Sequence, residues 1–137
     1  MNTHPYLRAY LAGIAVPTPL MLCGLTAYLI ARYFFNVPVP IERAAVFPLA
    51  VVPNAWGLWN VAYLALHDRW HLPIGVHGAL LPLLLIPAGY VLARLLGIDF
   101  IAQNVAWMWV AFPLALAIYY LVWKYLVNFC NHLLGVA

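Results

Sequence analysis

The sequence predicts an all-α integral membrane protein with four transmembrane helices, and three observations carry that prediction. Of its 137 residues, 68% are hydrophobic and only 7% are charged, and the mean hydropathy is +0.97. Soluble domains contain about 45–50% apolar and about 25% charged residues, so this chain has too little polar surface to coat a water-soluble particle. Four apolar runs are each long enough to cross a bilayer, and every run contains proline.

The four runs give the expected helices in order along the chain. Crossing the hydrocarbon layer takes about 20 apolar residues, and the runs that qualify are Ala9–Phe34, Ala44–Leu66, Val76–Gly97 and Asn104–Val127. The breaks between them carry turn and charge signals. We therefore expect a single multi-pass membrane domain over residues 1–137. The first run is expected to be retained, because no A-x-A-like signal-peptide cleavage site follows it.

The charges leave the orientation in the membrane open. With four spans, the N-terminus, the second connection and the C-terminus share one side of the membrane, which we call side A, and the other two connections share side B. The basic residues divide evenly, with Arg8, Arg69 and Lys124 toward side A and Arg32, Arg43 and Arg94 toward side B. The positive-inside rule therefore gives no orientation. Because these charges are scattered singly, no nucleic-acid surface is expected.

Proline occurs inside all four spans, at Pro17, Pro19, Pro48, Pro53, Pro82, Pro87 and Pro113. An interior proline removes a backbone hydrogen bond and bends a helix. We expect a bundle of proline-kinked helices that leave space between them. The alternative is that side-chain packing absorbs the bends.

A weak internal repeat relates the two halves of the chain. Sliding the sequence against itself until Gly13 meets Gly78 also aligns Pro17 with Pro82, and it aligns two copies of the motif FPLA at 47–50 and 112–115. Glycine and proline fix backbone shape, so their coincidence weighs more than the number of identities. The sequence predicts a tandem duplicated helical hairpin with a parallel pseudo-two-fold axis along the membrane normal.

A polar stripe is predicted on the second span. At about 100° per residue, Trp56, Asn60, Tyr63 and His67 share one face that runs from mid-membrane to side A. Polar side chains of this kind cost free energy when they face lipid, so we expect them to face the bundle interior or water. The repeat places the same residue types on the fourth span. Together they predict a half-cavity open on side A, lined by Trp56, Asn60, Tyr63, His67, Tyr125, Asn128 and His132. Two amphipathic helix ends at the interface are the alternative.

A second face of the same span carries small residues. Ala50, Asn54 and Gly57 fall at i, i+4 and i+7. Small residues allow helices in a membrane to approach closely, and an asparagine among them can hydrogen-bond across the contact. We expect this face to pack against a neighbouring helix.

Several functions remain open, and the leading expectation is transport or a channel for a small solute or ion. His67 and His132 suggest two axial haem ligands, with a quinone site beside them as a variant. A divalent metal is a further possibility, because His67 and His71 would share a face if the helix continued that far, and His77 or His132 would complete the site. The sequence contains no nucleophile–base arrangement, so an enzyme is not the leading expectation. A non-catalytic structural or assembly subunit is the alternative, and we expect a homo-oligomer or a subunit of a membrane complex.

Overall fold

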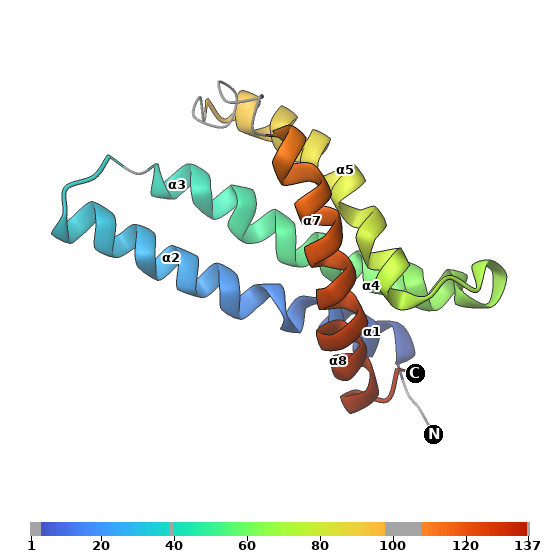
Figure 1. Cartoon of the computed structure of the whole chain (residues 1–137). Coiled ribbons are helices and arrows are strands. Elements are labelled where there is room, and N and C mark those ends of the chain that lie inside the picture. Colours follow the sequence, from blue (N-terminus) through green and yellow to red (C-terminus); the bar gives the residue numbers. More distant parts are fainter. Residues whose placement is uncertain (1–3, 39, 98–107, 137) are drawn as a thin grey trace.

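The computed structural model describes residues 4–38, 40–97 and 108–136, and every regular element in these ranges is helical (Figure 1). Within them, four stretches are long and apolar enough to cross a membrane: Pro5–Phe34, Ile41–Trp70, Ile74–Leu95 and Val110–Leu133. The all-helical class and the four apolar helices are thereby confirmed. The fourth helix continues to Leu133, beyond the predicted end at Val127, and its predicted start at Asn104 lies outside the described residues.

Each stretch is built from one to three elements. The first comprises α1 (Pro5–Ala15) and α2 (Pro17–Phe34), and the third is α5 (Ile74–Leu95). The second comprises α3 (Ile41–Ala44), the π-helical segment η1 (Ala45–Ala50) and α4 (Val51–Trp70). The fourth comprises α7 (Met108–Val122), the π-helical segment η3 (Trp123–Val127) and α8 (Asn128–Leu133).

Local sequence explains where several of these helices begin and end. Pro5 and Pro17 stand in the first turns of α1 and α2, where the missing N–H has no helical partner to lose. Phe47, directly before Pro48, leaves helical geometry with φ −136° and ψ 124°. At the end of α4, His71 adopts a left-handed conformation with φ 47°, and Pro73 follows shortly after it.

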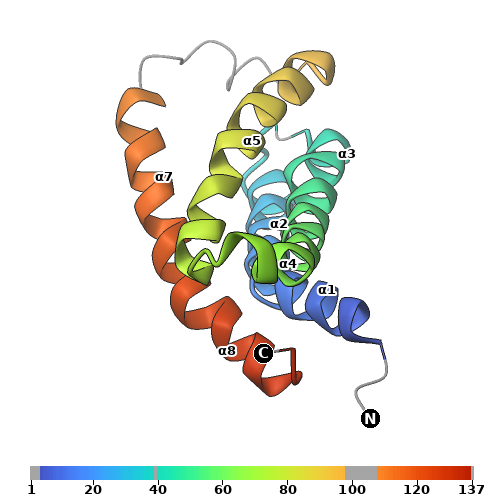
Figure 2. The ribbon, with the colours of Figure 1, turned by 90° about the vertical axis from the view of Figure 1, so that its right-hand side faces the viewer.

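The helices pair as two hairpins, with α1 packed on α4 and α5 packed on α7. The hairpins join where α4 meets α5 and α1 meets α8, so the N- and C-terminal helices lie at the same end of the molecule (Figure 1). At the other end the α2–α3 and α5–α7 arms diverge, and Figure 2 shows α5 between α7 and α3. Of the eighteen residues of α2, all of them described, Pro17 alone is buried.

The contact between α1 and α4 depends on two glycines. A Cβ on Gly13 would lie 2.6 Å from the Trp56 carbonyl oxygen and 2.8 Å from the Gly57 Cα. Beside this crossing, the Tyr10 hydroxyl of α1 donates to Asn54 Oδ1, while Asn54 Nδ2 donates to the Ala50 carbonyl at 2.7 Å. The prediction that the face bearing Asn54 and Gly57 packs against a neighbouring helix is confirmed.

Trp56 and Trp123 are the largest members of the buried core, which they form with Leu81 and Val127. The Trp56 ring centroid lies 5.5 Å from that of Trp123 and 5.0 Å from that of Tyr119. This core lies where the two hairpins meet. It separates the end of the bundle that holds the termini, side A, from the end where the arms diverge, side B.

Candidate functional site

Asn60 and Asn131 form a fully buried pair of amides on the side A half of the bundle. Asn60 Nδ2 donates to Asn131 Oδ1 at 2.7 Å and to the Ala9 carbonyl at 2.7 Å, and Asn131 Nδ2 donates back to Asn60 Oδ1 at 3.2 Å. Both side chains have 0% exposure. The pair links α4 with α8 and α1, and an amide in this position holds helices together by replacing the hydrogen bonds that water would give.

Trp59 and His77 make a second polar connection, between α4 and α5. Trp59 Nε1 donates to the His77 carbonyl at 2.8 Å, and His77 Nε2 lies 2.9 Å from the Trp59 carbonyl. Because a carbonyl oxygen only accepts, this second bond requires the proton on Nε2. The two rings are stacked with their centroids 4.8 Å apart. His77 therefore holds two helices in contact.

The structure gives the seven predicted cavity residues different surroundings. Trp56 lies in the core and Asn60 bonds to Asn131, so these two face the bundle interior. The Tyr63 ring lies 5.1 Å from the ring of exposed His67 and 5.2 Å from that of His77. On the fourth helix, Tyr125 is 60% exposed, Asn128 is half-buried and His132 is exposed. The structure thus does not bring Asn60 and Tyr125 to one shared wall, and their role in ligand binding stays a prediction.

The histidines predicted for haem or metal lie in separate environments. The condition for pairing His67 with His71 on one helical face is not met, because α4 ends at Trp70 and His71 is left-handed. Within the ranges that the structure describes, no three His, Cys, Asp or Glu side chains lie close enough to share a metal ion. A hollow of only about 10 Å³ lies beside Tyr63, His67 and His77.

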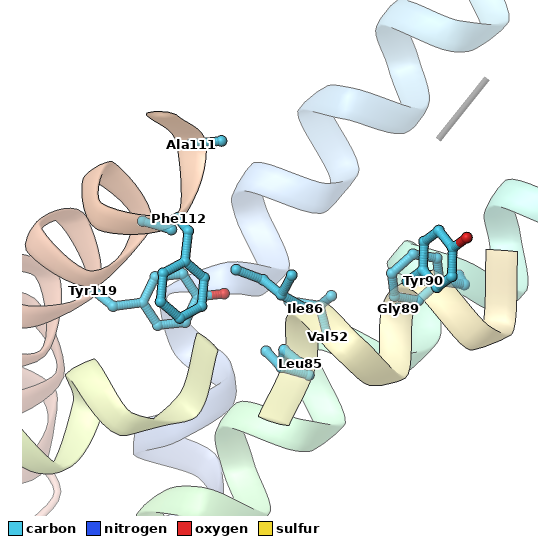
Figure 3. A pocket seen from close by; sticks show the side chains of 10 residues that line it. Val52, Leu85, Ile86, Gly89, Tyr90, Ala111, Phe112 and Tyr119 are labelled. Atoms are coloured by element: carbon cyan, nitrogen blue, oxygen red, sulfur yellow. The ribbon is translucent and has the colours of Figure 1, made fainter. Parts of the chain in front are cut away.

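A larger cavity lies elsewhere, on the side B half between the two hairpins. Its volume is about 350 Å³, and we call it the inter-hairpin cavity (Figure 3). Its walls come from η1, α4, α5 and α7, and ten residues line it: Phe47, Val52, Leu85, Ile86, Gly89, Tyr90, Ala111, Phe112, Ala115 and Tyr119. None of these described residues carries a formal charge, so the cavity suits an apolar occupant.

Small residues on two helices create this space. A Cβ on Gly89 would lie 2.7 Å from the Phe47 ring, so glycine there lets Phe47 of one hairpin rest directly on α5 of the other. Ala111 and Ala115 are too short to fill the gap from α7. The cavity therefore results from short side chains on α5 and α7 opposite aromatic rings.

Tyr119 and Tyr90 bring polar atoms to the cavity. Trp56 Nε1 donates to the Tyr119 hydroxyl at 3.3 Å, so the hydroxyl oxygen acts as an acceptor and its own hydrogen remains available to donate. Tyr90 lies nearer the side B end of α5, and the guanidinium carbon of Arg94 lies 5.8 Å from its ring centroid. A ligand in the cavity would meet an apolar wall with one phenol near each end.

Sequence reasoning missed Asn131 and the cavity lining. The repeat aligned Asn60 with Tyr125, which directed attention to Asn128 and away from Asn131. A search for asparagines inside apolar spans would have found Asn131, because a buried amide needs a partner. The lining residues carry no such signal, since leucine, alanine and phenylalanine are ordinary in any membrane helix. A comparison of the chain with protein-family models, curated proteins and solved structures finds no match.

Proposed function

We propose that this chain is a multi-pass integral membrane protein that binds a lipid-soluble small molecule in the inter-hairpin cavity. The observation that carries the proposal is an uncharged cavity of about 350 Å³ between the hairpins. Ligand pockets span about 300–1,000 Å³ and are lined mainly by apolar and aromatic side chains with a few polar groups. Tyr119 and Tyr90 provide such groups here.

The state of the polar residues supports a lipid-soluble ligand over a small polar solute. Polar side chains in the bundle already form hydrogen bonds to neighbouring helices, as Asn60, Asn131 and His77 do. A cavity needs about 10–15 Å³ to hold one water, so the hollow beside Tyr63 and His67, at about 10 Å³, has room for one water molecule at most. A quinone belongs to the ligand class that the larger cavity favours, although it would bind away from His67.

Insertion of the four helices in a bilayer gives such a ligand a route. The exposed surfaces of the helices are apolar, as lipid contact requires, and the cavity lies between arms that diverge toward side B. A molecule dissolved in the membrane would enter sideways between the hairpins. The proposed hairpin duplication fits the same site, because the two FPLA motifs each contribute their phenylalanine, Phe47 and Phe112, from opposite hairpins.

Filling the cavity tests this function. We expect detergent-purified protein to bind dodecan-1-ol, and an Ala115→Leu variant to lose that binding, because the added side chain occupies the ligand's space. Ala117→Leu is the matched control, since Ala117 lies on the same helix and is exposed. Native mass spectrometry gives the bound fraction. Equal occupancy in the two variants would show that the alcohol binds elsewhere.

Self-association is a second proposal, and α2 offers the surface on which a second copy would pack. Apart from Pro17, the described residues of this long apolar helix have little protein cover. A second copy of the chain would bury this surface in a membrane complex. Exposed Cys23 on α2 offers a direct test, since mild oxidation in membranes should give a disulfide-linked dimer that Cys23→Ser abolishes. A chain that remains monomeric at every concentration would exclude this role.

A further inference from the structure

Arg94 places a positive charge beside the side B end of the inter-hairpin cavity. It follows Tyr90 by one helical turn on α5, and its guanidinium carbon lies 5.8 Å from the Tyr90 ring centroid. Tyr90 in turn lines the cavity. The Arg94 side chain is exposed, so its charge meets solvent or membrane headgroups while the ring beneath it faces the apolar space.

The other basic residues on side B already have partners. Arg32 pairs with Glu42 at 3.1 Å, which neutralises its charge. Arg43 Nη1 donates to the Gly97 carbonyl at 3.1 Å, at the end of α5. Arg94 has no carboxylate partner among the residues that the structure describes. Its charge is therefore available to an anion at the edge of the cavity.

We propose that the occupant of the inter-hairpin cavity is a long-chain carboxylate, with its hydrocarbon chain in the cavity and its head group paired with Arg94. The inference rests on the proposed function. A guanidinium presents two parallel N–H donors that match the two oxygens of a carboxylate. The guanidinium of Arg94 carries one positive charge, which matches the single negative charge of a fatty acid.

The size of the cavity supports a single hydrocarbon chain as the occupant. A volume of about 350 Å³ lies near the lower end of the range for ligand pockets, so the space admits a single hydrocarbon chain. Phe112 and Ile86 present flat and branched carbon surfaces to it, and Tyr119 lies at the end of the lining opposite Tyr90 (Figure 3). A carboxylate beside Arg94 would leave the chain pointing along these residues toward the core.

Two probes with the same hydrocarbon chain, dodecanoate and dodecan-1-ol, separate the contribution of the head group from that of the cavity. The two probes compete for detergent-purified protein, which is the wild type, Arg94→Gln or Arg69→Gln. Native mass spectrometry gives the ratio of bound probes. The wild type should prefer dodecanoate by about fivefold, as a partly solvated ion pair allows. Arg94→Gln should lose the preference and still bind dodecan-1-ol. Arg69→Gln removes an exposed charge on side A and should keep the preference.

The outcomes distinguish this inference from the function on which it rests. If the wild type binds both probes equally, or if Arg94→Gln keeps the preference, the carboxylate proposal is overturned while cavity binding stands. If neither probe binds, both proposals fall. Dodecyltrimethylammonium is a further probe, and binding as tight as that of dodecanoate would also overturn the pairing with Arg94.

Discussion

The two halves of this bundle are held together by different means. On side A, the amides of Asn60 and Asn131 join three helices by hydrogen bonds, and both side chains are completely buried. On side B, the hairpins meet mainly through the Phe47 ring resting on Gly89, and a cavity of about 350 Å³ remains beside this contact. Polar residues close one end, and short apolar residues leave the other end open.

This difference separates residues that hold the fold from residues that form a site. Inside a bilayer no water is present to satisfy a polar group, so an asparagine is stable where another helix supplies the partner. Such residues mark contacts between helices. A cavity arises instead where short side chains leave a gap that the neighbouring rings do not fill, as at Ala115 on α7.

The largest expected effect comes from the contact between α1 and α4, where backbone atoms face Gly13. Gly13→Ala should destabilise the fold by about 3 kcal/mol, because its Cβ would overlap backbone atoms of Trp56 and Gly57 that cannot move aside. Gly24 on α2 is the matched control, since a Cβ there meets nothing within 4 Å. Gly24→Ala should stabilise the helix by about 0.5 kcal/mol. Unfolding in mixed micelles measures both, and equal effects would contradict the difference in packing.

Removal of one amide should have the next largest effect. Asn60→Leu leaves Asn131 and the Ala9 carbonyl without their partner and should cost about 2 kcal/mol of unfolding free energy. Asn128→Leu, at a half-buried position, should change stability by no more than about 0.5 kcal/mol. In a double-mutant cycle, Asn131→Leu should cost less in the Asn60→Leu background than in the wild type. Additive costs would mean that the two amides do not interact.

A smaller effect is expected at the contact between α4 and α5. Trp59→Phe keeps the stacked ring and removes the hydrogen bond to the His77 carbonyl, at a cost of about 1 kcal/mol. Trp70→Phe shortens an exposed tryptophan on the same helix and serves as the control. The same unfolding measurement applies. A greater loss from Trp70→Phe would show that hydrogen bonding does not stabilise this contact.

The smallest effect, and one of opposite sign, is expected on side B. Ala115→Leu should raise the unfolding free energy by about 0.5 kcal/mol, because it fills empty space. The exposed Ala117→Leu control should leave stability unchanged. A loss of stability in Ala115→Leu would mean that side B is packed as tightly as side A.

The sequence predicted the elements much better than the partners of their side chains. Apolar runs of about 20 residues identified the four helices, since about this many apolar residues are needed to cross a bilayer. The face bearing Asn54 and Gly57 was also predicted, because small residues at helical spacing mark a close contact. The partner of Asn60 was not predicted, because it depends on how far one hairpin is shifted against the other. The sequence placed Asn60 on the wall of a half-cavity, whereas the structure bonds it to Asn131.

By itself, the sequence determined that this protein has four apolar helices and which of their faces carry polar or small residues. Hydropathy and helical periodicity are properties of consecutive residues, so they can be read along the chain. Only the tertiary structure decided that Asn131 completes the buried amide pair and that a cavity remains beside Phe47 and Gly89. These features depend on the positions of helices distant in sequence, which are set by the packing of whole surfaces rather than by any local pattern.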